Sequence, residues 1–115
     1  MKKTIIEINN KEYELKYTIN SLIEMQEVTG IDVLNIAEIT WDLKTIRILL
    51  KYAMKHENKK ITDAQAGDLM GEYFEAGNTF DTLVLTLIRV LAYSLGGSDE
   101  ENAESDKEIK DEEGK

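Results

Sequence analysis

The chain has 115 residues, of which 42% are hydrophobic, and it carries a net charge of −9. This length predicts one domain with a modest core, and the absence of cysteine excludes a disulfide framework and any cysteine-based zinc site or nucleophile. Residues 98–115 hold nine acidic and three basic residues, so their net charge of −6 leaves only −3 for residues 1–97. A mimic of DNA and a nucleic-acid-binding domain are therefore both disfavoured, because the body is close to neutral.

Two alternating segments, at residues 3–8 and 12–17, predict a β-hairpin at the start of the chain. The residues on the apolar faces are Thr4, Ile6 and Ile8 in the first segment, and Tyr13, Leu15 and Tyr17 in the second. Asn9, Asn10 and Lys11 lie between them, and asparagine tolerates the positive φ of a tight turn. A lone hairpin is marginally stable, so its apolar face is expected to pack on helices. The segment lacks the continuous apolar stretch of a signal peptide, which predicts a cytoplasmic protein.

Two further helices are expected between the hairpin and residue 39. The first ends at Gly30, and it begins either at Asn20 or at Ser21, which forms a capping-box pattern with Glu24. The second is shorter, covers residues 31–39, and is capped by Asp32.

A strong amphipathic helix is predicted from Trp41 to Glu57, capped by Thr40 or Asp42. Opposite its apolar side runs a basic stripe of Lys44, Arg47, Lys51 and Lys55. These cations recur at three- and four-residue steps, so they line up along one face of the helix. We interpret the stripe as a solvated face; the alternatives are a docking surface for an acidic partner segment or for the protein's own tail.

Another helix is predicted from Thr62, which forms a capping box with Gln65, to about Ala76. Gly67 and Gly71 lie inside this helix, and each weakens it by roughly 1 kcal/mol relative to alanine. Close approach of a second helix accounts for such glycines, and so does a break of the helix near Gly71.

The clearest helical pattern runs from Asn78 to Gly97 and predicts a central core helix. Its apolar face consists of Phe80, Leu83, Val84, Leu87, Ile88, Leu91 and Leu95, extended by Val90. Asp81 and Arg89 interrupt a run that is already short for a bilayer, so the pattern does not predict a membrane span. Leu85 lies beside Arg89 on the polar side, either as an ordinary exposed leucine or as part of a partner surface.

Beyond Gly97, only Ala103 and Ile109 are apolar, so residues 98–115 are predicted to be a disordered acidic tail. The predicted fold is α+β and mainly α. An N-terminal β-hairpin packs on a bundle of about four to five helices, within a single domain of residues 1–97.

The sequence gives no pattern typical of a catalytic or metal site. His56 and Glu57 begin like a zinc-protease motif, but position 60 is lysine where a second histidine is needed. In the tail, Glu104 occupies the position where a calcium loop starting at Asp99 requires glycine. We therefore predict a non-enzyme without catalytic, metal-binding or cofactor-binding residues, in which His56 is a helix-end cation.

Several segments, in their order and spacing, resemble the small tail assembly chaperones of long-tailed phages and prophages, especially those of low-GC Gram-positive hosts. The resemblance covers about residues 4–95. Its segments are residues 8–16, residues 20–24 with Gly30, residues 49–57, and Ile61-Thr62 followed by Gly67-Asp68-Leu69.

The resemblance implies a protein of virion morphogenesis that acts in the host cytoplasm and is absent from the mature virion. Such chaperones are thought to bind the tape measure protein, keep it soluble and help bring tail tube subunits to it. Many are also made in a longer, frameshifted form. On this hypothesis the candidate partner-binding residues are Leu85, Arg89 and the four cations of the basic stripe. The alternative is a small phage or bacterial regulator that binds another protein through an acidic surface.

Overall fold

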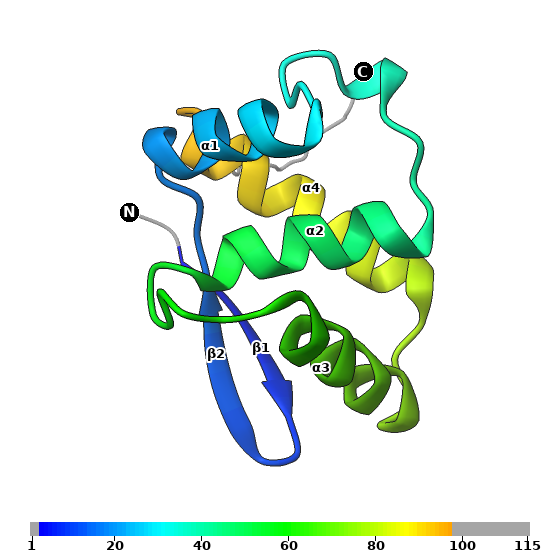
Figure 1. Ribbon diagram of the computed structural model, residues 1–115. Coiled ribbons are helices and arrows are strands. Elements are labelled where there is room, and N and C mark those ends of the chain that lie inside the picture. Colours follow the sequence, from blue (N-terminus) through cyan, green and yellow to red (C-terminus); the bar gives the residue numbers. More distant parts are fainter. Residues whose placement is uncertain (1–2, 98–115) are drawn as a thin grey trace.

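The computed structural model describes residues 3–97, which form an antiparallel β-hairpin and four α-helices (Figure 1). The strands are β1, Thr4–Ile8, and β2, Lys11–Leu15. The helices are α1, Ile19–Thr29, α2, Leu43–Met54, α3, Asp63–Glu75, and α4, Phe80–Ser94. The predicted α+β, mainly α fold is confirmed, whereas the predicted tail at residues 98–115 lies outside the described residues.

The hairpin closes through a two-residue turn at Asn9 and Asn10, whose φ angles are 54° and 65°. Ile8 pairs with Lys11 across the turn, so Lys11 belongs to β2 and the turn is one residue shorter than predicted. The face predicted for β1 is buried as expected, at Thr4, Ile6 and Ile8. This face lies toward α3 and α4, and it closes one end of the core.

The central helix of the fold is α2, which packs against α1, α3, α4 and β2 (Figure 1). Its fully buried residues are Ile46, Leu49, Leu50 and Ala53. The sequence assigned the central place to α4, which is a core helix through Leu83, Leu87, Val90 and Leu91 but contacts fewer elements. The broad apolar face of α4 can be recognised in the sequence. In α2, the four cations of the basic stripe suggest a solvent-exposed side, so the sequence underestimates how much of this helix is buried.

Side-chain caps set where the helices begin. Thr62 and Gln65 form the predicted capping box of α3. Of the two caps predicted for α2, Thr40 and Asp42, the structure has Asp42, whose carboxylate accepts from the Thr45 backbone N–H. α1 begins earlier than expected, because Thr18 forms a capping box with Ser21. The predicted caps at Asn20 and Ser21 are therefore wrong. Similarly, α4 is capped by Thr79, one residue after Asn78.

The helix predicted at residues 31–39 does not form. The Asp32 carboxylate accepts from the Leu34 backbone N–H, a local turn that competes with helix initiation. Only a 3₁₀ turn follows, at Ile36–Glu38, and Val33 is the buried anchor of this connection. Leu34 and Ile36 stay exposed, so the segment buries too little of its apolar surface for packing to hold it as an α-helix.

Residues 14–17, here called the clamp segment, connect the hairpin to two helices. The Lys16 N–H donates to the Ala53 carbonyl of α2 over 3.0 Å, and the Tyr17 hydroxyl donates to the Leu49 carbonyl over 2.7 Å. The Tyr17 N–H donates to Ser94 Oγ at the end of α4 over 3.1 Å. The hairpin is thereby fixed to the C-terminal ends of both α2 and α4.

Candidate partner-binding surface

The solvent-facing side of α4 carries the two residues that the sequence placed off the core face. Leu85 is 62% exposed and Arg89 is exposed beside it, while Leu83 and Leu87 on the opposite side are fully buried. Their position outside the core is therefore as predicted. A leucine with this much exposed surface gives up hydrophobic stabilisation that a partner can recover on binding.

Leu85 is the first of four small or apolar residues that form a line along α4. The residues of this line, here called the α4 seam, are Leu85, Ile88, Ala92 and Leu95. Ile88 is half-buried, whereas Ala92 is exposed and Leu95 is 40% exposed. The sequence had placed Leu95 on the core face, and this is wrong. Leu95 follows the last residue of α4, where the chain turns through Gly96 at a φ of 93°.

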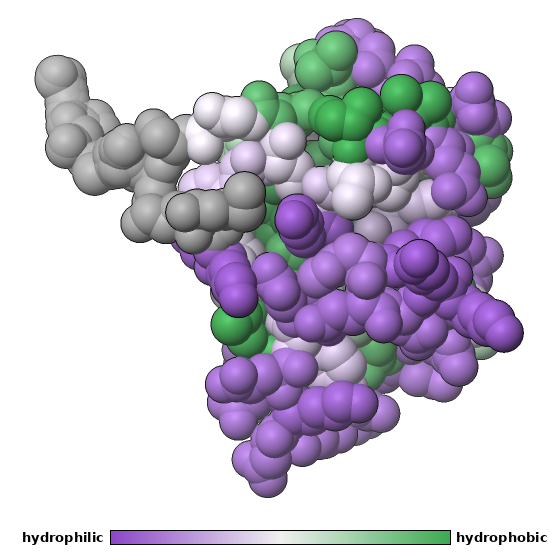
Figure 2. Space-filling view, turned by 90° about the vertical axis from the view of Figure 1, so that its left-hand side faces the viewer, coloured by the Kyte–Doolittle hydropathy of each residue, from purple (hydrophilic) through white to green (hydrophobic). Residues whose placement is uncertain are grey.

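Other large apolar side chains are exposed on different elements. They are Ile5 on β1, Ile19, Ile23 and Val28 on α1, Leu34 and Ile36 in the following connection, and Leu43 at the start of α2. Figure 2 shows hydrophobic residues gathered at the end of the molecule that contains α1, whereas the hairpin end is mainly hydrophilic. These exposed residues come from four separate segments of the chain, whereas the α4 seam is one regular line on a single helix, so the seam is the more specific feature.

A shallow hollow of about 870 Å³ lies where α2 and α4 begin and α3 ends. Its apolar lining comes from Leu43, Phe74 and Phe80, and its polar rim includes Asp42 and Lys44. The rings of Phe74 and Phe80 lie 6.4 Å apart, centroid to centroid. The hollow therefore lies at the end of the helical bundle opposite the clamp segment.

Most of the basic stripe on α2 is half-buried, because neighbouring helices partly cover it. Lys44 is exposed, but Arg47, Lys51 and Lys55 are half-buried. The Lys51 ammonium lies 3.1 Å from the Asp63 carboxylate of α3, and the Lys55 ammonium lies 3.6 Å from the Glu24 carboxylate of α1. The expectation that Arg47 and Lys51 face solvent is therefore wrong, because neighbouring helices cover this side of α2. A partner-binding role for the stripe stays a prediction, and Lys44 is its most accessible member.

Arg47 lies against α3 at a glycine. A Cβ atom placed on Gly67 would lie 3.4 Å from Arg47 Cδ, which is an ordinary van der Waals contact with a flexible side chain. α3 is continuous past Gly71, which excludes the predicted alternative of a break. The contact at Gly67 is with a side chain and not with a second helix backbone, and among the described residues nothing lies within 4 Å of a Cβ added at Gly71, so close helix approach explains neither glycine.

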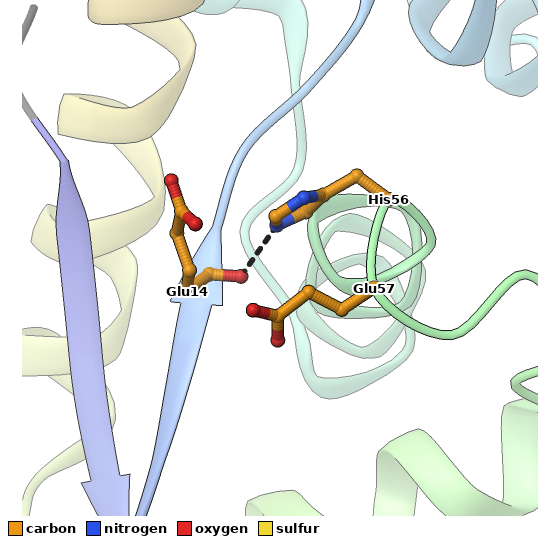
Figure 3. Close-up of side chains that lie close together, drawn as sticks. All are labelled: Glu14, His56 and Glu57. Atoms are coloured by element: carbon orange, nitrogen blue, oxygen red, sulfur yellow. Dashed lines mark hydrogen bonds between the residues drawn. The ribbon is translucent and has the colours of Figure 1, made fainter.

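His56 lies just after α2 and forms a cluster with Glu14 and Glu57. Its Nε2 is 2.8 Å from the backbone carbonyl oxygen of Glu14, so this nitrogen donates, because a carbonyl can only accept (Figure 3). The ligand atoms of the three side chains lie within 4.8 Å of one another. In Figure 3 the two carboxylates lie on either side of the hydrogen bond. While Nε2 carries that proton, this nitrogen cannot bind a metal ion. The hydrogen bond instead connects β2 to the residues that follow α2.

Comparison with known protein families, with curated proteins and with solved structures gives no match. The resemblance to tail assembly chaperones therefore remains a hypothesis that depends on the sequence segments quoted above. Within residues 3–97, no helix is both long enough and apolar enough to cross a membrane.

The sequence predicts that Leu85 and Arg89 lie outside the core, but it does not identify the other residues of the α4 seam. The alternating three- and four-residue steps from Leu85 to Leu95 are readable in the sequence. Ile88 and Leu95, however, also fit the edge of the broad core face, so the pattern alone does not separate the two roles. Distinguishing the two roles requires knowing how wide a strip of α4 the other elements cover, which is a tertiary property.

Proposed function

We propose that this protein is a tail assembly chaperone, which binds a phage tape measure protein and promotes assembly of the tail tube around it. The sequence resemblance supports the proposal, and the structural observation that carries it is Leu85, a large apolar side chain in the middle of the solvent face of α4. On this proposal the protein acts in the host cytoplasm during assembly and is absent from the mature virion.

This function requires that the chaperone bind the apolar helix faces of its partner reversibly. A tape measure protein exposes long apolar helix faces until the tail tube surrounds it, so alone it should aggregate. A small domain with its own closed core can cover such a face with exposed apolar side chains framed by charge. Leu85 and Arg89 have this arrangement on α4. Release requires only that the tail tube bind the same faces more favourably.

The test is the solubility of the tape measure protein on co-expression. With this chain, a soluble complex is expected, whereas the tape measure protein alone should pellet. Tail tube subunits and the longer frameshifted form are supplied in a second set of cultures, because assembly is proposed to involve both. A tape measure protein that stays insoluble in every combination would rule out the chaperone function.

A further inference from the structure

We infer that the α4 seam docks one amphipathic helix of the partner, with an acidic side chain of that helix beside Arg89. The inference deepens the proposed function and rests on it for the identity of the partner. The kind of helix follows from the geometry of α4.

The period of the seam selects a helix as the occupant. Leu85, Ile88, Ala92 and Leu95 follow steps of three, four and three residues, the spacing with which two helices interlock side chains along a common seam. Asp81 continues the same line by four residues and ends the apolar run. Ala92 is the small, exposed member of this line. An extended peptide, whose side chains alternate with a period of two, would not match these steps.

The charges of Arg89 and Asp81 favour a helix of a different protein over a second copy of α4 as the occupant of the seam. Arg89 lies on the flank of the seam and has no ion pair with any residue in the described range 3–97. A parallel pair of α4 helices would place Asp81 against Asp81. The antiparallel register that aligns all four seam residues would bring Arg89 beside Arg89. A different helix, with an apolar seam, an acidic residue near Arg89 and a basic residue near Asp81, avoids both repulsions.

The direct test uses the full chain and two synthetic three-heptad peptides with leucine at every seam position. One peptide carries glutamate at the flanking positions and the other carries lysine. Fluorescence anisotropy should show that the glutamate peptide binds more tightly. Leu85→Glu should weaken its binding at least about tenfold, since a buried leucine is lost and a charge is introduced. Leu85→Ala, a milder change, should weaken binding less.

Leu34→Glu is the matched control. Leu34 is 80% exposed, more than Leu85, but it lies in the connection between α1 and α2. This variant should bind as the unchanged chain does. Arg89→Glu should reverse the order of the two affinities, so that the lysine peptide binds more tightly than the glutamate peptide. Circular dichroism checks that each variant keeps its helical content, which is expected because these side chains lie outside the core.

Three results would overturn the inference: no binding of either peptide, equal losses for Leu85→Glu and Leu34→Glu, or sedimentation showing a dimer that Leu85→Glu dissociates. The dimer would make a second copy the occupant. Co-expression separates this inference from the proposed function. If Leu85→Glu still keeps the tape measure protein soluble, the seam assignment is wrong and the function stands. If the peptides bind as expected but the tape measure protein stays insoluble, the function is wrong and the seam stands.

Discussion

Tyr17 buries its hydroxyl group against α2, where it donates to the Leu49 carbonyl over 2.7 Å. Only 2% of the residue is exposed, and this burial raises the pKa of the phenol well above its ordinary value of about 10. An acid whose pKa is raised by folding stabilises the fold below the unfolded-state pKa, and that contribution is lost as pH rises above it. The fold should therefore lose stability above pH ~10.

Tyr17→Phe tests this expectation. At neutral pH the variant should lose about 1 kcal/mol of unfolding free energy, the usual net value of one hydrogen bond. Above pH ~10 its loss of stability should be shallower than that of the unchanged chain, since the buried ionisable group is gone. Urea denaturation across a pH series measures both effects, with Tyr13→Phe as a half-buried control. Identical alkaline profiles for Tyr17→Phe and the unchanged chain would contradict the assignment.

Gly71 gives a second prediction at the scale of one residue. It lies exposed inside α3, and a Cβ added there would meet none of the residues 3–97 within 4 Å. Gly71→Ala should therefore stabilise the protein by up to about 1 kcal/mol, through lower backbone entropy in the unfolded chain. Gly67→Ala should gain less, because its Cβ reaches Arg47 Cδ. The urea midpoints of the two variants compare these gains, and a larger gain for Gly67→Ala would show that the contact with Arg47 costs no stability.

At the scale of elements, the α2–α3 packing depends partly on the ion pair between Lys51 and Asp63. The hydrogen bond and charge of Lys51 hold the pKa of the Asp63 carboxyl below its usual value. A carboxyl whose pKa is lowered by folding stabilises the fold above its unfolded-state pKa of about 4, and this contribution disappears as pH falls through the lower folded-state pKa.

Lys51→Gln should accordingly destabilise the fold at pH ~7 by less than about 1 kcal/mol, because the pair is partly exposed to solvent. The difference from the unchanged chain should narrow below pH ~4. Lys44→Gln, which changes the exposed member of the basic stripe, is the matched control and should have little effect. Equal effects of the two substitutions at neutral pH would mean that the ion pair contributes nothing.

Local chemistry made several elements predictable, and tertiary packing accounts for the errors. The Asp42 cap, the Thr62 capping box and the Asn9-Asn10 turn are formed by neighbouring residues, so the sequence reveals them directly. The environment of Lys51 depends on Asp63 of another helix, and that of Lys55 on Glu24. A helical wheel shows that the stripe is continuous, but it cannot show that two neighbouring helices lie over it.

The same distinction holds for the candidate site. The exposure of Leu85 follows from its place opposite the core face and was predictable. The seam that joins it to Leu95 depends on where α4 ends and on how much of Ile88 the fold leaves uncovered.

For the whole molecule, we expect residues 98–115 to contribute nothing measurable to folding stability. They contain only two apolar residues, Ala103 and Ile109, so they offer little surface to bury. A chain ending at Gly97 should have the same midpoint of thermal unfolding as the full chain. A loss of several degrees on truncation would show that the tail docks on the domain, and the exposed Lys44 would be the first place to look for the contact.

The clamp segment has a consequence for the order in which the protein folds. The hairpin is synthesised before the helices, yet the N–H of Tyr17, which follows β2, donates to Ser94 Oγ, and β1 packs against α3 and α4. During synthesis on the ribosome, the hairpin therefore has no complete partner surface until α4 has emerged. Until then, the apolar side chains of Ile6, Ile8 and Leu15 can contact other chains, whereas the local turn at Asn9 and Asn10 can form at once. The described domain is complete only when β1 and the end of α4 have both packed, so its folding couples elements that lie far apart in the sequence.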